Sequence, residues 1–139
     1  MVSLDSIEPL ALTLKCLWRN KMPHVVLENI NSVSEVIESI VPFTTRIDGG
    51  ILKVTDTYIN SGQNKVLVES LAIENNTNQS FFVELSQKKA SLTVRLLPLT
   101  DPAKTPGVKM IMATVAKQIK DSNSDVSYGK TNLQDFLLE

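Results

Sequence analysis

The stretch TPGVKMIMATVAKQIKD, residues 105–121, is the strongest indicator of fold in this 139-residue chain. Thr105 is a good helix cap, and Pro106 suits the first helical position, where its missing N–H costs nothing. Five apolar side chains then recur at helical spacing and form one stripe roughly 100° wide, and these are Val108, Ile111, Met112, Val115 and Ile119. Lysines lie on the other side. The pattern predicts a long amphipathic helix whose stripe covers another layer of the protein.

The residues before this helix predict that layer, because their apolar positions alternate with a period of two. Short polar or glycine-containing turns separate the alternating segments, as in a hairpin series. The predicted strands cover residues 44–48, 51–59, 65–74, 80–86 and 91–97. Strands joined by such short turns form an antiparallel meander with one buried face. We therefore expect a four- or five-stranded antiparallel sheet beneath the helix.

A strand–helix unit precedes the meander. Residues 24–30 predict a short strand, and Ser32 with Glu35 three residues later has the spacing of a capping box. Apolar residues follow at helical spacing until Pro42 ends the helix. Residues 9–18 fit either a strand or a helix, and their leucines and alanine favour the helix.

The chain divides into one predicted domain and a short C-terminal extension. Residues 1–121 form a single α+β domain, and residues 122–139 form a polar linker with a short apolar end. In that extension Thr131 and Gln134 repeat the capping-box spacing. The order of strand, helix, meander and long final helix is similar to that of helix-grip ligand-binding domains. The similarity lies in element order alone, so any function must be argued from a site.

Composition excludes several kinds of chemistry. Fourteen basic and fifteen acidic residues leave a net charge of −1, which gives no bulk attraction to nucleic acid or an anionic membrane. Cys16 and His24 are the single cysteine and histidine, so we expect no internal disulfide, no multi-histidine metal site and no cofactor. No third group orients these two side chains for catalysis, and ordinary packing is expected of them. No apolar stretch approaches the roughly 20 residues of a membrane span. With an N-terminus that lacks early positive charge, the sequence is typical of a cytoplasmic protein.

Two acids on one face of a predicted hairpin, Asp56 and Glu69, are the most suggestive chemical feature. A four-residue loop after residue 59 would place Val54 opposite Glu69 and Asp56 opposite Leu67. Asp56 and Glu69 would then be diagonal neighbours about 7 Å apart. In an apolar pocket such a pair could act in acid–base chemistry or hold a cation, because proximity pushes the two pKa values apart.

The next turn decides whether those acids are buried. If residues 75–78 also form a four-residue turn, the core face carries Val66, Val68, Ser70 and Ala72, and both acids face solvent or a partner. A turn one residue longer or shorter would bury them, because a single-residue slip reverses the face. Solvated acids are favoured, since an unpaired buried carboxylate is costly.

Three functions remain open. The favoured one is a non-enzymatic interaction module that binds a protein partner or a second copy as a homodimer. It would act through a sheet edge or face and through the C-terminal apolar residues Leu133, Phe136, Leu137 and Leu138. The second is a carrier of a small apolar ligand in an enclosed cavity, with the lining candidates Val108, Ile111, Met112, Val115, Phe81 and Val83. The third is an enzyme that uses Asp56 and Glu69.

Overall fold

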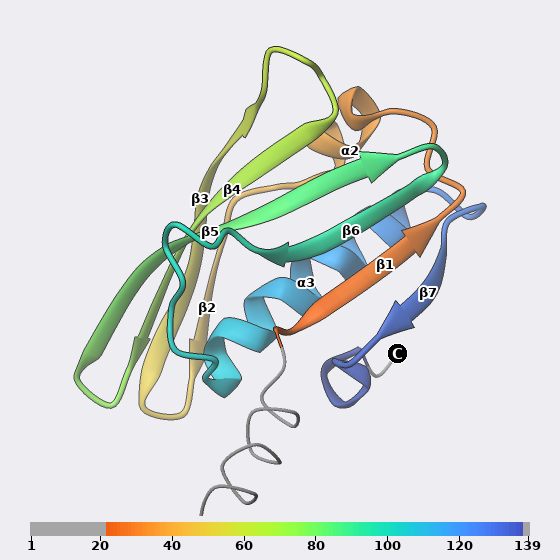
Figure 1. The fold of residues 1–139 in the computed structure, drawn as a ribbon. Helices are drawn as coiled ribbons and strands as arrows, with labels where there is room; N and C mark the ends of the chain where they lie inside the picture. The colour runs from red at the N-terminus through yellow and green to blue at the C-terminus, as the bar shows by residue number, and fades with distance from the viewer. Residues whose placement is uncertain (1–21, 138–139) are drawn as a thin grey trace, which may run out of the picture.

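Seven antiparallel strands form one curled sheet in the computed structural model, which describes residues 22–137 (Figure 1). The strand order across the sheet is β2-β3-β4-β5-β6-β1-β7. In chain order the elements are β1 (His24–Glu28), α2 (Val33–Ser39), β2 (Phe43–Ile47), β3 (Gly50–Ile59), β4 (Lys65–Glu74), β5 (Thr77–Lys88), β6 (Ser91–Leu96), α3 (Pro106–Ser122), β7 (Ser127–Thr131) and the 3₁₀ helix η1 (Gln134–Phe136).

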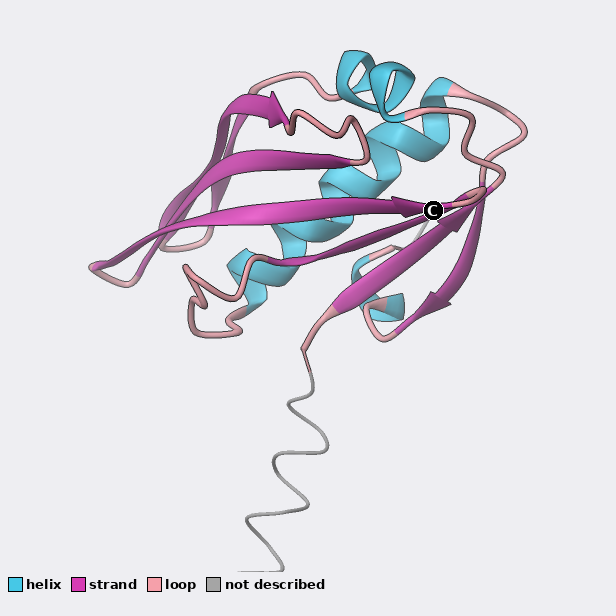
Figure 2. Cartoon of the chain, turned by 45° about the horizontal axis from the view of Figure 1, so that its top comes forward, coloured by secondary structure: helices cyan, strands magenta, loops and turns pink. Residues whose placement is uncertain are grey.

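Helix α3 lies against one face of the sheet, as its sequence pattern predicts (Figure 2). The hydroxyl of Thr105 accepts a hydrogen bond from the Val108 N–H at 3.3 Å and caps the helix. Every residue of the predicted stripe is at most 1% exposed. The stripe meets the core-facing rows of the sheet, which include Leu52, Val54, Val66, Val68, Phe81, Val83, Leu85, Leu92 and Val94. The α+β fold with a helix-covered antiparallel sheet is therefore confirmed.

The predicted count of four or five strands is wrong, because two strands join the sheet by long-range pairing. β1 crosses to the far side of the meander, where Val25 lies opposite Val94 and Leu27 opposite Leu92 of β6. β7 then pairs with the free edge of β1. The sequence predicts a linker for most of the β7 residues, because Ser-Tyr-Gly-Lys-Thr lacks the alternation of apolar and polar side chains that a half-buried strand shows. Helix α3 is consequently not the last element of the chain.

Helix α2 begins as predicted, with a simpler cap than the sequence suggests. The hydroxyl of Ser32 accepts from the Glu35 N–H at 3.4 Å. The carboxylate of Glu35 accepts from the Asn31 side-chain amide, also at 3.4 Å, and no reciprocal bond to Ser32 forms between these described residues. The helix ends before Ile40, and it packs against α3, β3 and β4. Residues 9–18, whose secondary structure the sequence leaves open, lie outside the described residues.

The β4–β5 turn, whose length the sequence leaves open, has two central residues. Glu74 pairs with Thr77, and Asn75 and Asn76 have φ values of 48° and 69°. Positive φ at both central positions defines a type I′ turn, which asparagine tolerates. A turn of two residues and a turn of four residues differ by an even number, so both place the same side chains of β4 and β5 on the same face of the sheet. The face with Val66, Val68, Ser70 and Ala72 is therefore the core face, as the four-residue turn predicts.

Candidate interaction surface

The face of the sheet opposite α2 and α3 carries none of the described helices, and we call it the open face. The strand registers place on it alternate residues of β2 to β6. Six of them are half-buried or exposed apolar and aromatic side chains, which we call the apolar stripe: Ile51, Tyr58, Leu67, Leu71, Ile73 and Phe82. Apolar side chains gathered on a face that none of the described helices covers are typical of interaction sites.

A β-bulge at Thr55 brings Asp56 onto this open face, where Glu69 lies by the alternation of β4. Before the bulge Val54 lies opposite Ser70, and after it Asp56 lies directly opposite Glu69. The predicted pairing of Asp56 with Leu67 is therefore wrong, and the acids are direct rather than diagonal neighbours. Without the extra residue, Asp56 would share the core face with Leu52 and Val54. Instead Asp56 is exposed and accepts from the Thr57 N–H at 2.8 Å, and Glu69 is half-buried.

Tyr58 connects the acids to the apolar stripe. Its hydroxyl donates to Oε1 of Glu69 at 2.8 Å, and its ring meets the edge of Phe82 with centroids 6.3 Å apart. The hydrogen bond to Glu69 raises the pKa of Tyr58, and burial together with the charges of Glu69 and Asp56 raises that pKa further. The hydrogen bond to Glu69 thus orients the ring of Tyr58 beside Phe82.

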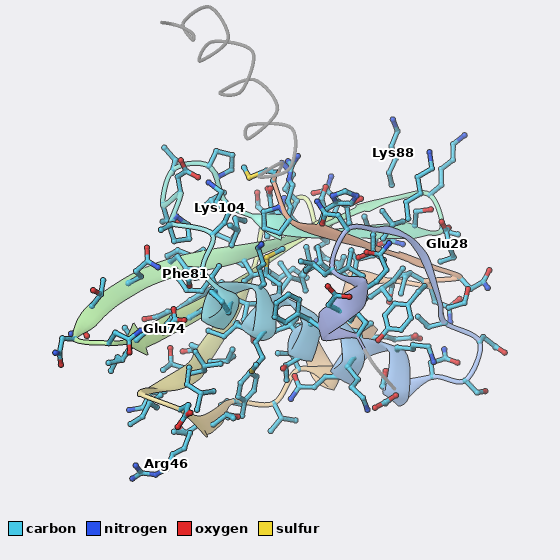
Figure 3. All side chains as sticks on the ribbon, turned by 90° about the horizontal axis from the view of Figure 1, so that it is seen from below. Glu28, Arg46, Glu74, Phe81, Lys88 and Lys104 are labelled. Atoms are coloured by element: carbon cyan, nitrogen blue, oxygen red, sulfur yellow. The ribbon has the colours of Figure 1, made fainter. Side chains whose placement is uncertain are left out.

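Two basic side chains lie on the same face near the acids. Lys53 precedes Asp56 by three residues on β3, and Arg46 comes from β2, opposite Ile51. Figure 3 shows Arg46 at the edge of the molecule, pointing away from it. Within residues 22–137, none of Arg46, Lys53, Asp56 and Glu69 takes part in an ion pair. The open face therefore presents an acidic pair, Asp56 and Glu69, and a basic pair, Arg46 and Lys53, that are both available.

A third carboxylate on this face, that of Glu84, is already neutralised by ion pairs within the chain. Glu84 is only 4% exposed, accepts from Nε of Arg95 at 2.8 Å, and lies 3.5 Å from Nζ of Lys65. Such a buried carboxylate needs these partners. These three side chains bound the apolar stripe on the side of β6.

A hollow of about 350 Å³ opens beside Glu69. Its lining combines apolar and polar side chains, from Thr55, Glu69, Ser70, Leu71, Ser80, Phe81, Phe82 and Thr100. Asp56 does not line it. The two acids therefore share a sheet face and do not converge on one hollow.

The residues predicted to line a ligand cavity all lie in the core. Val108, Ile111, Met112, Val115, Phe81 and Val83 are at most 1% exposed and belong to one packed cluster. Figure 3 shows Phe81 beside the first turn of α3. The pocket between α2 and α3 holds about 20 Å³, which is room for about one water molecule.

The predicted C-terminal partner site contacts the chain's own core. Leu133 is 2% exposed, and Phe136 and Leu137 pack against the core cluster. The hydroxyl of Thr131 accepts from the Leu133 N–H at 3.0 Å, so the second capping-box pattern forms a tight turn before η1. Leu138 lies outside the described residues.

Of the single histidine and the single cysteine, the structure describes the histidine. His24 has Nδ1 3.3 Å from the carbonyl oxygen of Met22, and Cys16 lies outside the described residues. Among residues 22–137, no three His, Cys, Asp or Glu side chains are placed to hold a metal ion.

Sequence reasoning does not find Arg46, Lys53 and Phe82 as parts of a surface. Their signal is their parity along β2, β3 and β5, which can be read only once the bulge and the turn lengths are known.

No helix in the described part of the chain is long and apolar enough to cross a membrane. Comparisons with protein-family models, with curated proteins and with solved structures gave no match for this chain.

Proposed function

We propose that this protein is a non-enzymatic interaction module that self-associates through its open face. The observation that carries the proposal is the apolar stripe on a sheet face that none of the described helices covers, beside acids and bases that form no ion pairs within residues 22–137. Two sheets that pack face to face bury such rows between them and form a second core about 10 Å thick.

The composition of the stripe supports a protein partner. Tyr58 and Phe82 are aromatic, and aromatic side chains are enriched at the centres of protein interfaces. The hydrogen bond to Glu69 and the edge contact with Phe82 hold Tyr58 in place before binding. A side chain that is already ordered loses less conformational entropy when a partner covers it.

The other surfaces considered from the sequence support this assignment less well. Leu133, Phe136 and Leu137 are engaged with the core of their own domain. Asp56 is exposed and does not line the hollow beside Glu69, so the acids fit charge recognition better than acid–base catalysis. We also place the module in the cytoplasm, where a lone cysteine such as Cys16 stays reduced.

The test replaces the centre of the apolar stripe. Leu71→Thr combined with Ile73→Thr keeps good strand formers at two half-buried positions, so the fold should persist. In a two-fold symmetric dimer each substitution is present twice. Truncating a buried interface side chain costs on the order of 1 kcal/mol or more of binding free energy. We therefore expect the dimer Kd, measured by sedimentation equilibrium, to rise at least about a hundredfold.

The matched control is Val26→Thr, a substitution on the same face but on β1, away from the stripe. It should leave the dimer Kd unchanged. A wild-type chain that stays monomeric at every concentration would overturn the proposal. So would a folded double variant that associates as tightly as the wild type.

A further inference from the structure

We infer that the occupant of the open face is a second copy of this chain, arranged so that the acidic pair of each copy contacts the basic pair of the other. This inference rests on the proposed function and adds the two-fold geometry of the contact. The interface would be isologous, because the same patch contributes both charge signs.

The positions of the charges fit this geometry. Lys53 and Asp56 lie on one face of β3, about 10 Å apart at the usual rise per residue. Glu69 lies opposite Asp56 on β4, and Arg46 extends the basic pair onto β2. A two-fold axis between the two sheets, midway between the pairs, places each acid against a base of the partner copy.

The apolar residues complete the patch around the axis. Leu71 lies opposite Lys53 on β4, two residues from Glu69 on the same strand. Ile51 and Ile73 are paired next to it. The partner copy would cover these side chains and exclude water. Exclusion of water strengthens the charge contacts and makes the arrangement specific.

Charge complementarity favours a second copy over an unrelated protein. The patch carries two acids and two bases, so it is complementary to itself. Glu84 on the neighbouring part of the face is paired within the chain with Lys65 and Arg95, so this carboxylate does not compete for the basic pair of a second copy.

The test exchanges single charges at Asp56 and Lys53, which leaves the Tyr58–Glu69 hydrogen bond intact. Asp56→Lys alone and Lys53→Glu alone each set like charges against each other across the axis. Each variant should bind its own kind at least about tenfold more weakly than the wild type. Its circular dichroism melt should match that of the wild type at concentrations where both are monomeric. An equimolar mixture of the two variants should form a heterodimer of near wild-type affinity, because opposite charges then face each other in both contacts.

The variant with both exchanges in one chain, Asp56→Lys with Lys53→Glu, should recover the homodimer. If the wild type dimerises but neither the mixture nor the double exchange recovers binding, the two-fold arrangement is wrong and self-association stands. If the single variants dimerise as the wild type does, these charges lie outside the interface. A wild type that never dimerises overturns the arrangement and the proposed function together.

Discussion

The hydroxyl of Tyr58 donates to the Glu69 carboxylate, and this bond exists only while the phenol is neutral. Loss of the proton would leave two negative charges in contact, with Asp56 adjacent. The pKa of Tyr58 is therefore raised by the hydrogen bond first, and by burial and the nearby charges in addition. A group whose pKa is higher in the folded state stabilises the fold fully below its unfolded pKa. That contribution is lost as the pH rises through the folded pKa.

Alkaline titration tests this coupling. In a Tyr128→Phe background, the phenolate absorbance of Tyr58 should appear above the usual tyrosine pKa of about 10. Glu69→Ala should bring the midpoint back toward that value. Asp56→Asn should shift it less, because Asp56 contributes only through its charge. A midpoint that does not move in Glu69→Ala would show that the hydrogen bond is absent in solution.

At the scale of elements, the β3–β4 hairpin shows why register is hard to read from sequence. Leu52 and Val54 face the core, and strict alternation would carry Asp56 into the core after them. A buried carboxylate without a partner is costly, so the bulge at Thr55 releases Asp56 to the open face. The Thr55-Asp56-Thr57 segment is polar throughout and has no local signal for the bulge. The Asn75-Asn76 turn is different, because asparagine at both positions is itself a recognised hairpin signal.

The end of β4 is joined to the start of α3 by one carboxylate. Glu74 accepts from the hydroxyl of Thr105 and, at 2.9 Å, from the N–H of Gly107. Figure 3 shows Glu74 beside the first turn of α3. The free N–H groups and the dipole of a helix N-terminus favour a negative charge there. A Cβ at Gly107 would lie 2.6 Å from the carboxyl carbon of Glu74, so alanine at this position requires the Glu74 carboxylate to move.

A double-mutant cycle tests that requirement. Glu74→Ala alone should cost about 1–2 kcal/mol in the free energy of unfolding, measured in urea. Gly107→Ala alone should destabilise the protein through the contact with Glu74. In the Glu74→Ala background, the same glycine substitution should stabilise the protein by about 0.5–1 kcal/mol, the ordinary helix preference for alanine. Glu38→Ala, at an exposed glutamate of α2, serves as the control. An equal effect of Gly107→Ala in both backgrounds would contradict the contact.

For the whole molecule, the sequence predicts the layers better than the outermost pairings. The stripe from Val108 to Ile119 can be buried only against the sheet, and the alternation from Ile51 to Leu96 defines that sheet. In contrast, β1 has no local feature that selects β6 over the other free edge of the meander, β2. Its pairing is decided by packing between residues more than sixty positions apart. β7 follows from that choice, because pairing with β6 leaves the other edge of β1 free.

Substitutions in the C-terminal segment separate effects on folding from effects on association. Leu133 is buried in the core cluster, so Leu133→Ala should lower the free energy of unfolding by about 2–4 kcal/mol. Under conditions where the variant is still folded, its dimer Kd should equal that of the wild type, since the open face is unchanged. Asp135→Ala, at an exposed neighbouring position, should alter neither quantity. If Leu133→Ala instead keeps full stability and fails to dimerise, then the C-terminal segment makes the contact between copies and the open face does not.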